Sequence, residues 1–141
     1  MLFPIEPNLN KHLSPNILII SSCGGHLAQA LEFYDCYKHH EHLFVINDRT
    51  DLDERMIGKT IFITHAERNY KQIANIIEAF ILLKRFKPKV IFSLGAAPAF
   101  IFAIIGKYFF NTKTIFVDSY SRVKTPSLTA RMIYRFSDSF Y

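Results

Sequence analysis

A glycine-rich segment near the N-terminus combines residue types that bind anions. The sequence SSCGGH (residues 21–26) follows a short apolar run and precedes a stretch with helical spacing. Small residues in such a turn expose backbone N–H groups at a helix start, where the positive end of the helix dipole favours a phosphate or a carboxylate. The segment predicts an anion site that includes Ser22, Gly24 and Gly25. A tight turn that needs glycine only for its backbone shape is the alternative.

Two side chains of this segment are chemically reactive. An imidazole beside a bound anion can accept a proton from a sugar hydroxyl, so His26 is a candidate general base, with a capping or packing role as the alternative. Cys23 would be a nucleophile if the helix start lowered its pKa, but no paired base is identifiable. The run HHEH (residues 39–42) resembles a metal site, yet its consecutive side chains point in different directions, which favours a solvated turn.

Two later segments carry similar chemistry. SLGAAP (residues 93–98) places Gly95 and other small residues before a helix, and in the commonest doubly wound order this loop lies beside the first one. DSYSRVKT (residues 118–125) gathers hydroxyls, one acid and two cations, which suits a diphosphate, with Arg122 as a bidentate ligand and Lys124 as a point charge. Alternatively, Asp118 and Arg122 pair only with each other and hold the loop.

The common nucleotide-binding motifs are absent. The dinucleotide fingerprint needs further glycines after Gly24, where the sequence has Ala28 and Gln29, and no phosphate loop ending in Gly-Lys-Ser/Thr is found. Asp48 follows the second expected strand, where an acid can bind a ribose. A free-standing nucleotide-binding domain is therefore kept as a third hypothesis.

The segments that position these loops alternate between strands and helices. Strands are expected at residues 16–21, 42–47, 60–64, 89–94 and 114–117, with a sixth beginning where the chain ends. Helices are expected from His26, over about four turns that close with basic residues before Pro88, over residues 97–109, and from Pro126 at a first turn. In the second of these helices, the apolar face comprises Ile73, Ile76, Ile77, Phe80, Ile81 and Leu83.

This alternation predicts a fold class. Apolar strands separated by helices indicate a Rossmann-like parallel sheet of five or six strands, with helices on both faces and right-handed crossovers. Ligands of such sheets bind at the carboxyl ends of the strands, where the three loops lie. The nearly all-apolar helix at residues 97–109 is interpreted either as a core helix or as part of a membrane-facing surface.

Length and composition limit the architecture. The 141 residues, half of them hydrophobic, suffice for one α/β domain and exclude a complete two-domain enzyme, a disulfide scaffold and a disordered chain. We expect an N-terminal extension over residues 1–15 and a single domain over residues 16–141. The two distant cysteines and the lack of a signal-peptide pattern indicate the cytosol. No apolar run approaches the length of a membrane-spanning helix.

The charge is unevenly distributed. The net charge is +5, and residues 106–141 hold six basic side chains against two acidic ones. Such a cationic end suits a phosphate, a nucleic acid or an acidic lipid. Nucleic acid is disfavoured because the basic residues are not interleaved with aromatic ones as in known binding modules.

Taken in order, the loops resemble those of a known family. Matching segments are SSCGGHLAQALEF (residues 21–33), ERNYKQ (residues 67–72), VIFSLGAAPA (residues 90–99) and above all the stretch from Thr114 to Tyr141. They resemble the membrane-associated subunit of two-component UDP-sugar glycosyltransferases. That family includes the anchoring subunit of the asparagine-linked glycosylation N-acetylglucosaminyltransferase and its bacterial exopolysaccharide and capsule relatives.

The resemblance implies half of a GT-B enzyme, the acceptor-side domain equivalent to its N-terminal half. Gly24, Gly25 and His26 match the family's glycine-rich loop, Gly95 its fourth-strand glycine, and Asp118, Ser119 and Arg122 its acid-Ser-x-x-Arg signature. The family often has Glu at the position of Asp118 and an acid at that of Gln29. It also usually continues past the equivalent of Tyr141 with a short tail that contacts the partner, and by this comparison we expect the tail to be missing here.

The implied reaction needs a second protein. A separate subunit would bind the UDP-sugar, which is a substrate, so no cofactor and no metal are expected. This chain would bind a polyprenyl-diphosphate-linked sugar at the cytoplasmic face of the membrane, with His26 as base and Ser22, Gly24, Gly25, Gly95, Asp118, Ser119, Arg122 and Lys124 around the phosphates. Alternatively, the chain is a non-catalytic module that recruits its partner to the membrane.

Overall fold

The computed structural model describes residues 14–47, 53–64, 71–95, 97–118 and 125–141. Its strands are β1 (Ile17–Ser21), β2 (His42–Ile46), β3 (Thr60–Phe62), β4 (Val90–Ser93), β5 (Lys113–Phe116) and β6 (Ser139–Phe140). Its helices are α1 (Gly25–Glu32), α2 (Tyr34–Tyr37), α3 (Lys71–Phe86), α4 (Ala97–Phe110) and α5 (Leu128–Ile133), with a short 3-10 helix, η1 (Glu54–Met56). Every strand expected from the sequence is present.

The strands form one parallel sheet in the order β3-β2-β1-β4-β5-β6. Ile19 lies opposite Phe44 of β2 and Phe92 of β4, so β1 is central and paired on both sides. The chain leaves β1 towards β2 and β3, then returns on the other side of β1 to β4, β5 and β6. This doubly wound topology confirms the predicted fold class, and β6 completes the expected sixth strand.

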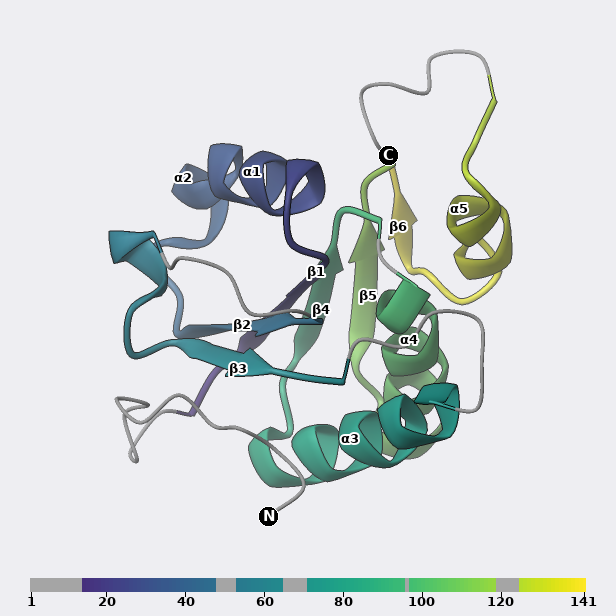
Figure 1. Cartoon of the computed structure of the whole chain (residues 1–141). Helices are drawn as coiled ribbons and strands as arrows, with labels where there is room; N and C mark the ends of the chain where they lie inside the picture. The colour runs from purple at the N-terminus through teal and green to yellow at the C-terminus, as the bar shows by residue number, and fades with distance from the viewer. Residues whose placement is uncertain (1–13, 48–52, 65–70, 96, 119–124) are drawn as a thin grey trace.

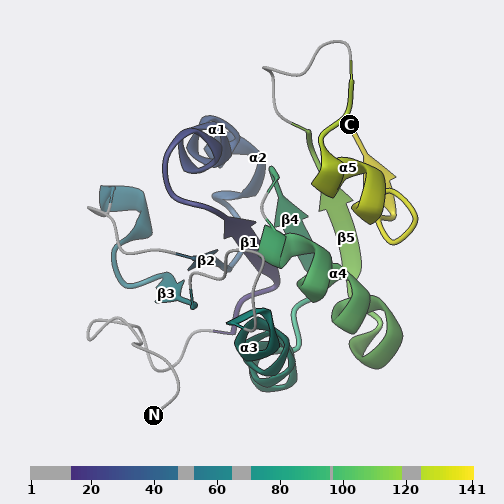
Figure 2. The same ribbon diagram turned by 45° about the vertical axis from the view of Figure 1, so that its right-hand side comes forward.

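Helices cover both faces of the sheet (Figure 1, Figure 2). Alternation along β1 sends Ile19 into a cluster with Leu27 and Ala30 of α1, whereas Leu18 and Ile20 join the larger cluster below α3, α4 and α5. We call the first the α1/α2 side and the second the α3/α4/α5 side. Because neighbouring side chains of a strand point to opposite faces, each half of the core draws on alternate residues.

The exposure of α3 reverses one expectation. Its sequence-predicted apolar face does not pack inward: Ile73, Ile76, Ile77, Phe80 and Ile81 are all exposed, and of that set only Leu83 is buried. The stripe that meets the sheet comprises Asn75, Glu78, Ala79, Leu82 and Leu83. The helix therefore has apolar residues on two sides. The side that packs on the sheet is the one that contains the smaller and the polar side chains.

Helix α4 packs as a core helix along most of its length and has an exposed end. Phe102, Ala103 and Gly106 are buried against the sheet, while Tyr108 and Phe109 near its end are exposed. A Cβ on Gly106 would lie 2.9 Å from Ile91 Cδ1, so this glycine lets the helix approach β4 closely. No helix within the described ranges combines the length and the apolar character needed to cross a bilayer.

Two helix boundaries differ from the sequence expectation. Pro126 does not open α5: Ser127 is the N-cap, and its side chain accepts a hydrogen bond from the Ala130 amide. This capping bond satisfies one of the backbone amides that have no partner within the first turn of a helix. The helical stretch after β1 is also interrupted at Phe33, which separates α1 from α2.

Candidate functional site

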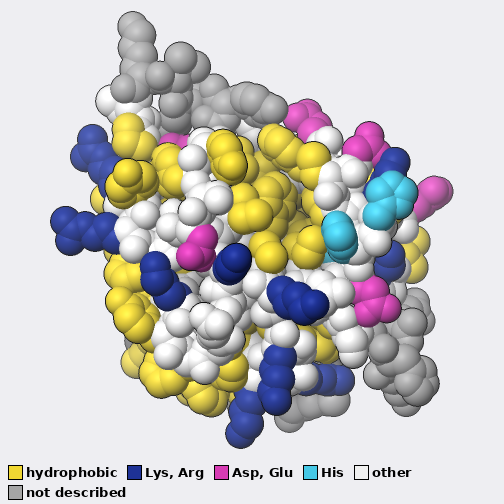
Figure 3. Space-filling view, turned by 180° about the vertical axis from the view of Figure 1, so that it is seen from behind, with side chains coloured by type: hydrophobic (Ala, Val, Ile, Leu, Met, Phe, Trp, Pro, Cys, Tyr) yellow, Lys and Arg dark blue, Asp and Glu magenta, His cyan; other side chains and the backbone are white. Residues whose placement is uncertain are grey.

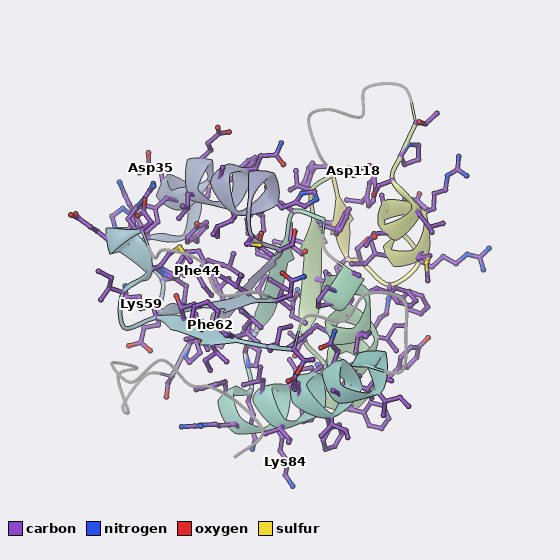
Figure 4. The ribbon with its side chains drawn as sticks, viewed as in Figure 1. Asp35, Phe44, Lys59, Phe62, Lys84 and Asp118 are labelled. Atoms are coloured by element: carbon purple, nitrogen blue, oxygen red, sulfur yellow. The ribbon has the colours of Figure 1, made fainter. Side chains whose placement is uncertain are left out.

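The loops singled out by the sequence meet at the carboxyl edge of the sheet. Ser22, Gly24, Gly25 and His26 follow β1, Gly95 follows β4 and Asp118 follows β5. Since β4 pairs with β1 on one side and β5 on the other, these three loops are consecutive along the edge. Figure 4 shows Asp118 there, near α5. Ser119, Arg122, Lys124 and Asp48 lie outside the described residues.

The start of α1 depends on Gly24. This residue has φ +86° and ψ −138°, a conformation that side chains strongly disfavour, and no side chain caps the helix. A Cβ on Gly24 or Gly25 would have no described atom within 4 Å, so the space beside the helix start is open. The glycines thus provide the turn, and they also leave backbone N–H groups accessible at the positive end of the helix dipole.

The imidazole of His26 lies against Gly95. A Cβ at position 95 would lie 3.0 Å from His26 Cε1 and 3.4 Å from Nδ1, and Gly95 itself has φ +85°. Glycine is therefore required there for both backbone and space. Nδ1 of His26 is buried with no hydrogen-bond partner, although the side chain as a whole is half-buried. This contact joins the loops that follow β1 and β4, which are expected from the sequence to lie side by side.

Asp118 follows β5 and interacts with residues at the start of α5 and at the end of β6. Its backbone N–H donates to the carbonyl of Tyr141 at 2.8 Å, and its Oδ2 accepts from the Ser127 amide at 3.1 Å. Part of the carboxylate thus holds the residue that caps α5, which is a structural role. The sequence alternative of a pair with Arg122 falls outside the described residues.

Two polar residues near this edge were missed by the sequence reasoning. Asn47 directly follows β2 and is nearly fully buried, and its Oδ1 has no hydrogen-bond partner. Glu78 of α3 is buried, and both its oxygens accept from the Thr64 amide at 3.1 Å. Asn47 had a weak signal, as a polar residue at the end of an apolar run. Glu78 had none, because its partner is fourteen positions away.

The remaining reactive candidates are part of the packing. Cys23 packs against the α1/α2 core cluster. His42, expected in a solvated turn, is instead fully buried between Tyr34, Tyr37 and Phe44, and its Nδ1 lies 2.8 Å from the His40 carbonyl oxygen. The rest of the run is exposed, as expected of a solvated turn. His42 differs because the first residue of β2 points into the core. Burial lowers the pKa of His42 below its ordinary value.

The strand order and the glycine loops at one edge define a class: a Rossmann-like domain of the kind that forms the N-terminal half of GT-B proteins. Acinetobacter baumannii MurG matches over 89% of this chain and 40% of its own, with a TM-score of 0.66 and 12% identity. A UDP-GlcNAc 2-epimerase from Methanocaldococcus jannaschii matches over 89% and 38%, with a TM-score of 0.62 and 11% identity. The S. aureus MnaA–UDP co-structure matches over 89% of this chain and 36% of its own, with a TM-score of 0.58 and 15% identity.

The family follows from the sequence itself. The chain belongs to the family described as oligosaccharide biosynthesis protein Alg14 like, whose sequence model matches residues 54–141. This confirms the resemblance inferred from the loops and places the chain among glycosyltransferase-related proteins. No curated protein matches the sequence significantly. The chain spans about two fifths of the length of the three structures, so they establish the fold alone.

Proposed function

We propose that this chain is the acceptor-side subunit of a two-component UDP-sugar glycosyltransferase. A separate subunit binds the UDP-sugar, of the N-acetylglucosamine or a related type, and this chain binds a polyprenyl-diphosphate-linked sugar at the cytoplasmic face of the membrane. Family membership supports the setting in oligosaccharide biosynthesis. A UDP-sugar donor is supported by folds shared with a UDP-GlcNAc 2-epimerase and with a protein solved with UDP.

The contact between His26 and Gly95 carries the proposal. It places an imidazole at the open start of α1, on the edge of the sheet where doubly wound proteins bind ligands. In the proposed reaction, the acceptor hydroxyl attacks the anomeric carbon of the donor, the new glycosidic bond forms, and the bond to UDP breaks. His26 takes the proton of the hydroxyl, and UDP leaves with the electron pair.

The acceptor diphosphate is assigned to residues of the three loops that follow β1, β4 and β5. Backbone N–H groups after Gly24 and Gly25 and the Gly95 loop provide neutral donors, and Ser22 adds a hydroxyl. Ser119, Arg122 and Lys124 add a further hydroxyl and two cations, with Arg122 suited to bidentate contact. Asp118 orders the start of α5 through Ser127. These assignments leave the donor's nucleotide to the partner.

The direct test is sugar transfer by the complex with its partner. The double variant His26→Ala/Arg122→Ala should reduce the rate by at least about 100-fold, since general base catalysis alone contributes that much. His39→Ala is the matched control, because His39 is exposed and far along the chain from the site, and it should leave the rate unchanged. Transfer at an undiminished rate by the double variant would exclude this function.

Gly95→Ala tests the positioning of the imidazole. The new Cβ would displace His26, and the positive φ would strain the loop, so kcat should fall. In a His26→Ala background the same substitution should have a much smaller effect, because the displaced group is gone. Equal effects in both backgrounds would show that Gly95 acts independently of His26.

A non-catalytic recruitment module is the second candidate, and the exposed apolar residues of α3 favour it. Under this alternative, His26→Ala leaves turnover intact, whereas deletion of residues 125–141 releases the partner from membranes. The acceptor-side function predicts the opposite result for His26→Ala.

A further inference from the structure

The outer side of α3 carries a continuous row of apolar side chains. Ile73, Ile76, Ile77, Phe80 and Ile81 follow helical spacing on one side, and Ile73 is 61% exposed. Their helix already contributes a different stripe to the core, so this row is not needed to cover the sheet. Large apolar side chains grouped on a surface, unlike scattered ones, indicate a contact that the isolated chain does not make.

The row continues onto the neighbouring helices. The ring of Phe80 lies 6.0 Å from that of Phe109 at the end of α4, where Tyr108 and Phe109 are each 68% exposed. On α5, Leu128 and Met132 are also exposed. We define the apolar face as these nine residues: Ile73, Ile76, Ile77, Phe80 and Ile81 of α3, Tyr108 and Phe109 of α4, and Leu128 and Met132 of α5.

A groove of about 630 Å³ crosses this face. Its lining includes Ile76 from α3, Phe100, Ile101 and Ile104 from α4, and Leu128 and Met132 from α5, and Thr129 is its one polar residue. The volume lies within the range of small-molecule pockets. The wall begins at Ala97, two positions after Gly95, so the groove extends from near the candidate site along the outer side of the domain.

On the described parts of α3, α4 and α5, the exposed charged side chains have one sign. Lys84 and Arg85 at the end of α3, Lys107 of α4 and Arg131 of α5 are exposed. Figure 4 shows Lys84 pointing away from the sheet. Among the described side chains of these helices, the one acid is Glu78, which is buried and bonded to Thr64. An apolar surface rimmed by cations complements anionic lipid headgroups above an apolar interior.

We propose that the apolar face docks on an anionic lipid bilayer, with lipid chains filling the groove. The inference deepens the proposed function, on which it rests: it identifies the membrane-contacting surface and gives α3 the main part. A bilayer fits better than a second copy of this chain, because a two-fold interface would bring the same cations together. It also fits better than a typical protein interface, where lysine is depleted.

This docking would orient the candidate site. Helix α4 starts at the sheet edge that carries Gly95, and the groove starts at the same end of the helix. With the face on the bilayer, that edge lies beside the headgroups. A diphosphate on a membrane-embedded chain then reaches the Gly95 loop while its apolar chain follows the groove.

Vesicle flotation with the full chain tests the proposal. The protein should float with vesicles that contain phosphatidylglycerol and much less with phosphatidylcholine alone. The double variant Ile73→Ser/Ile77→Ser should lower the partition coefficient by at least about tenfold, as expected for the loss of two partly buried isoleucines. Lys84→Ala/Arg85→Ala should weaken binding and reduce its dependence on salt.

Ile57→Ser is the matched control, because Ile57 is 54% exposed but follows η1, outside the three helices. It should bind vesicles like the wild type, and unfolding midpoints should be similar for all variants. Vesicle binding unchanged by Ile73→Ser/Ile77→Ser would overturn the proposal. So would the loss of self-association or of partner binding in that variant with vesicle binding intact.

A second readout separates this proposal from the proposed function. With its partner, Ile73→Ser/Ile77→Ser should transfer sugar to a water-soluble short-chain acceptor at the wild-type rate and lose transfer to a vesicle-embedded acceptor. If the wild-type complex transfers no sugar at all, the enzymatic function fails, while flotation still tests the membrane face. Equal losses on both acceptors would contradict a docking role.

Discussion

The helix layers on the two sides of the sheet differ in the side chains that they expose to solvent. On the α1/α2 side the surface charges have both signs, with Asp35 and Lys38 paired at 2.6 Å and Arg55 bonded to Asp53 at 2.7 Å. On the α3/α4/α5 side the large exposed side chains of the helices are aliphatic, aromatic or cationic. Figure 3, seen from behind, shows most Asp, Glu and His side chains on the side of α1 and α2.

This difference distinguishes the apolar side chains that folding requires from those that it does not require. Both sides bury an apolar stripe under their helices, and both halves of the core contain fully buried aromatic or aliphatic side chains. Folding requires only those inner stripes. The outer apolar row of α3 stays exposed, and within it Phe80 packs on Phe110 at the edge of the core. The exposed remainder of the row is explained by a contact with something else.

The largest effect on stability is expected from the inner stripe of the α1/α2 side. Phe44 is fully buried and lies edge-on to His42 and Tyr37. Phe44→Ala should lower the free energy of unfolding by about 3–5 kcal/mol, because it removes buried apolar surface and leaves a cavity. Urea denaturation measures the change. A loss below about 1 kcal/mol would mean that this side is loosely packed and would weaken the comparison.

Glu78→Ala should cause the next largest loss of stability, because the carboxylate of Glu78 is buried and hydrogen-bonded. The carboxylate accepts from the amide and hydroxyl of Thr64, and Asn75, with its amide nitrogen facing Glu78, donates to it at 2.9 Å. Its loss leaves these buried donors unpaired, at a cost of about 1–3 kcal/mol. Glu78→Gln keeps one acceptor oxygen and should cost less in the same denaturation experiment. Equal stability of Glu78→Ala and the wild type would refute the inward role of this side chain.

The sequence predicted the fold better than it predicted the outer surface of α3. The β-branched runs and intervening helical spacing identify the strands because both are local patterns. The spacing of Ile73 and Phe80 marked one side of a helix as apolar. It could not tell whether that side packs inward, because Ala79 and Leu82 give the same helix a second apolar stripe. That choice depends on which stripe the sheet and α4 accept.

The candidate site was predictable in its loops but not in its contacts. Glycines between a strand and a helix are a local signal, so Gly24 and Gly25 could be identified. The packing of His26 against Gly95 joins residues 69 positions apart and depends on the pairing of β1 with β4. Asn47 and Glu78 were missed for the same reason, since their importance comes from burial rather than from a motif.

A pH-dependent effect should come from His42 on the α1/α2 side. Burial lowers its pKa in the folded protein, whereas the unfolded chain has the ordinary value of 6.5. As the pH falls through 6.5, the unfolded state takes up a proton before the folded state does, so the free energy of unfolding decreases towards lower pH.

Replacing the imidazole isolates this contribution. His42→Phe keeps an aromatic ring in the cluster and removes the titrating group, so its stability should fall less steeply than that of the wild type between about pH 7 and pH 5. Urea midpoints across this range measure the slope. His39→Ala is the control, because His39 is exposed and should leave the slope nearly unchanged. Identical slopes for His42→Phe and the wild type would show that His42 is accessible to protons when folded.

The smallest effect on stability is expected from the outer row of α3. Ile73→Ser removes an exposed apolar side chain and barely changes helix propensity, so the free energy of unfolding should change by no more than about 0.5 kcal/mol. Urea denaturation of this variant beside Phe44→Ala gives the contrast directly. A loss of unfolding free energy near that of Phe44→Ala would show that the outer row belongs to the core. The two sides of the sheet would then differ only in the charges that they expose. A negligible cost, combined with weaker vesicle binding, would mean that the isoleucine is kept for contact with lipid, at no gain to the fold.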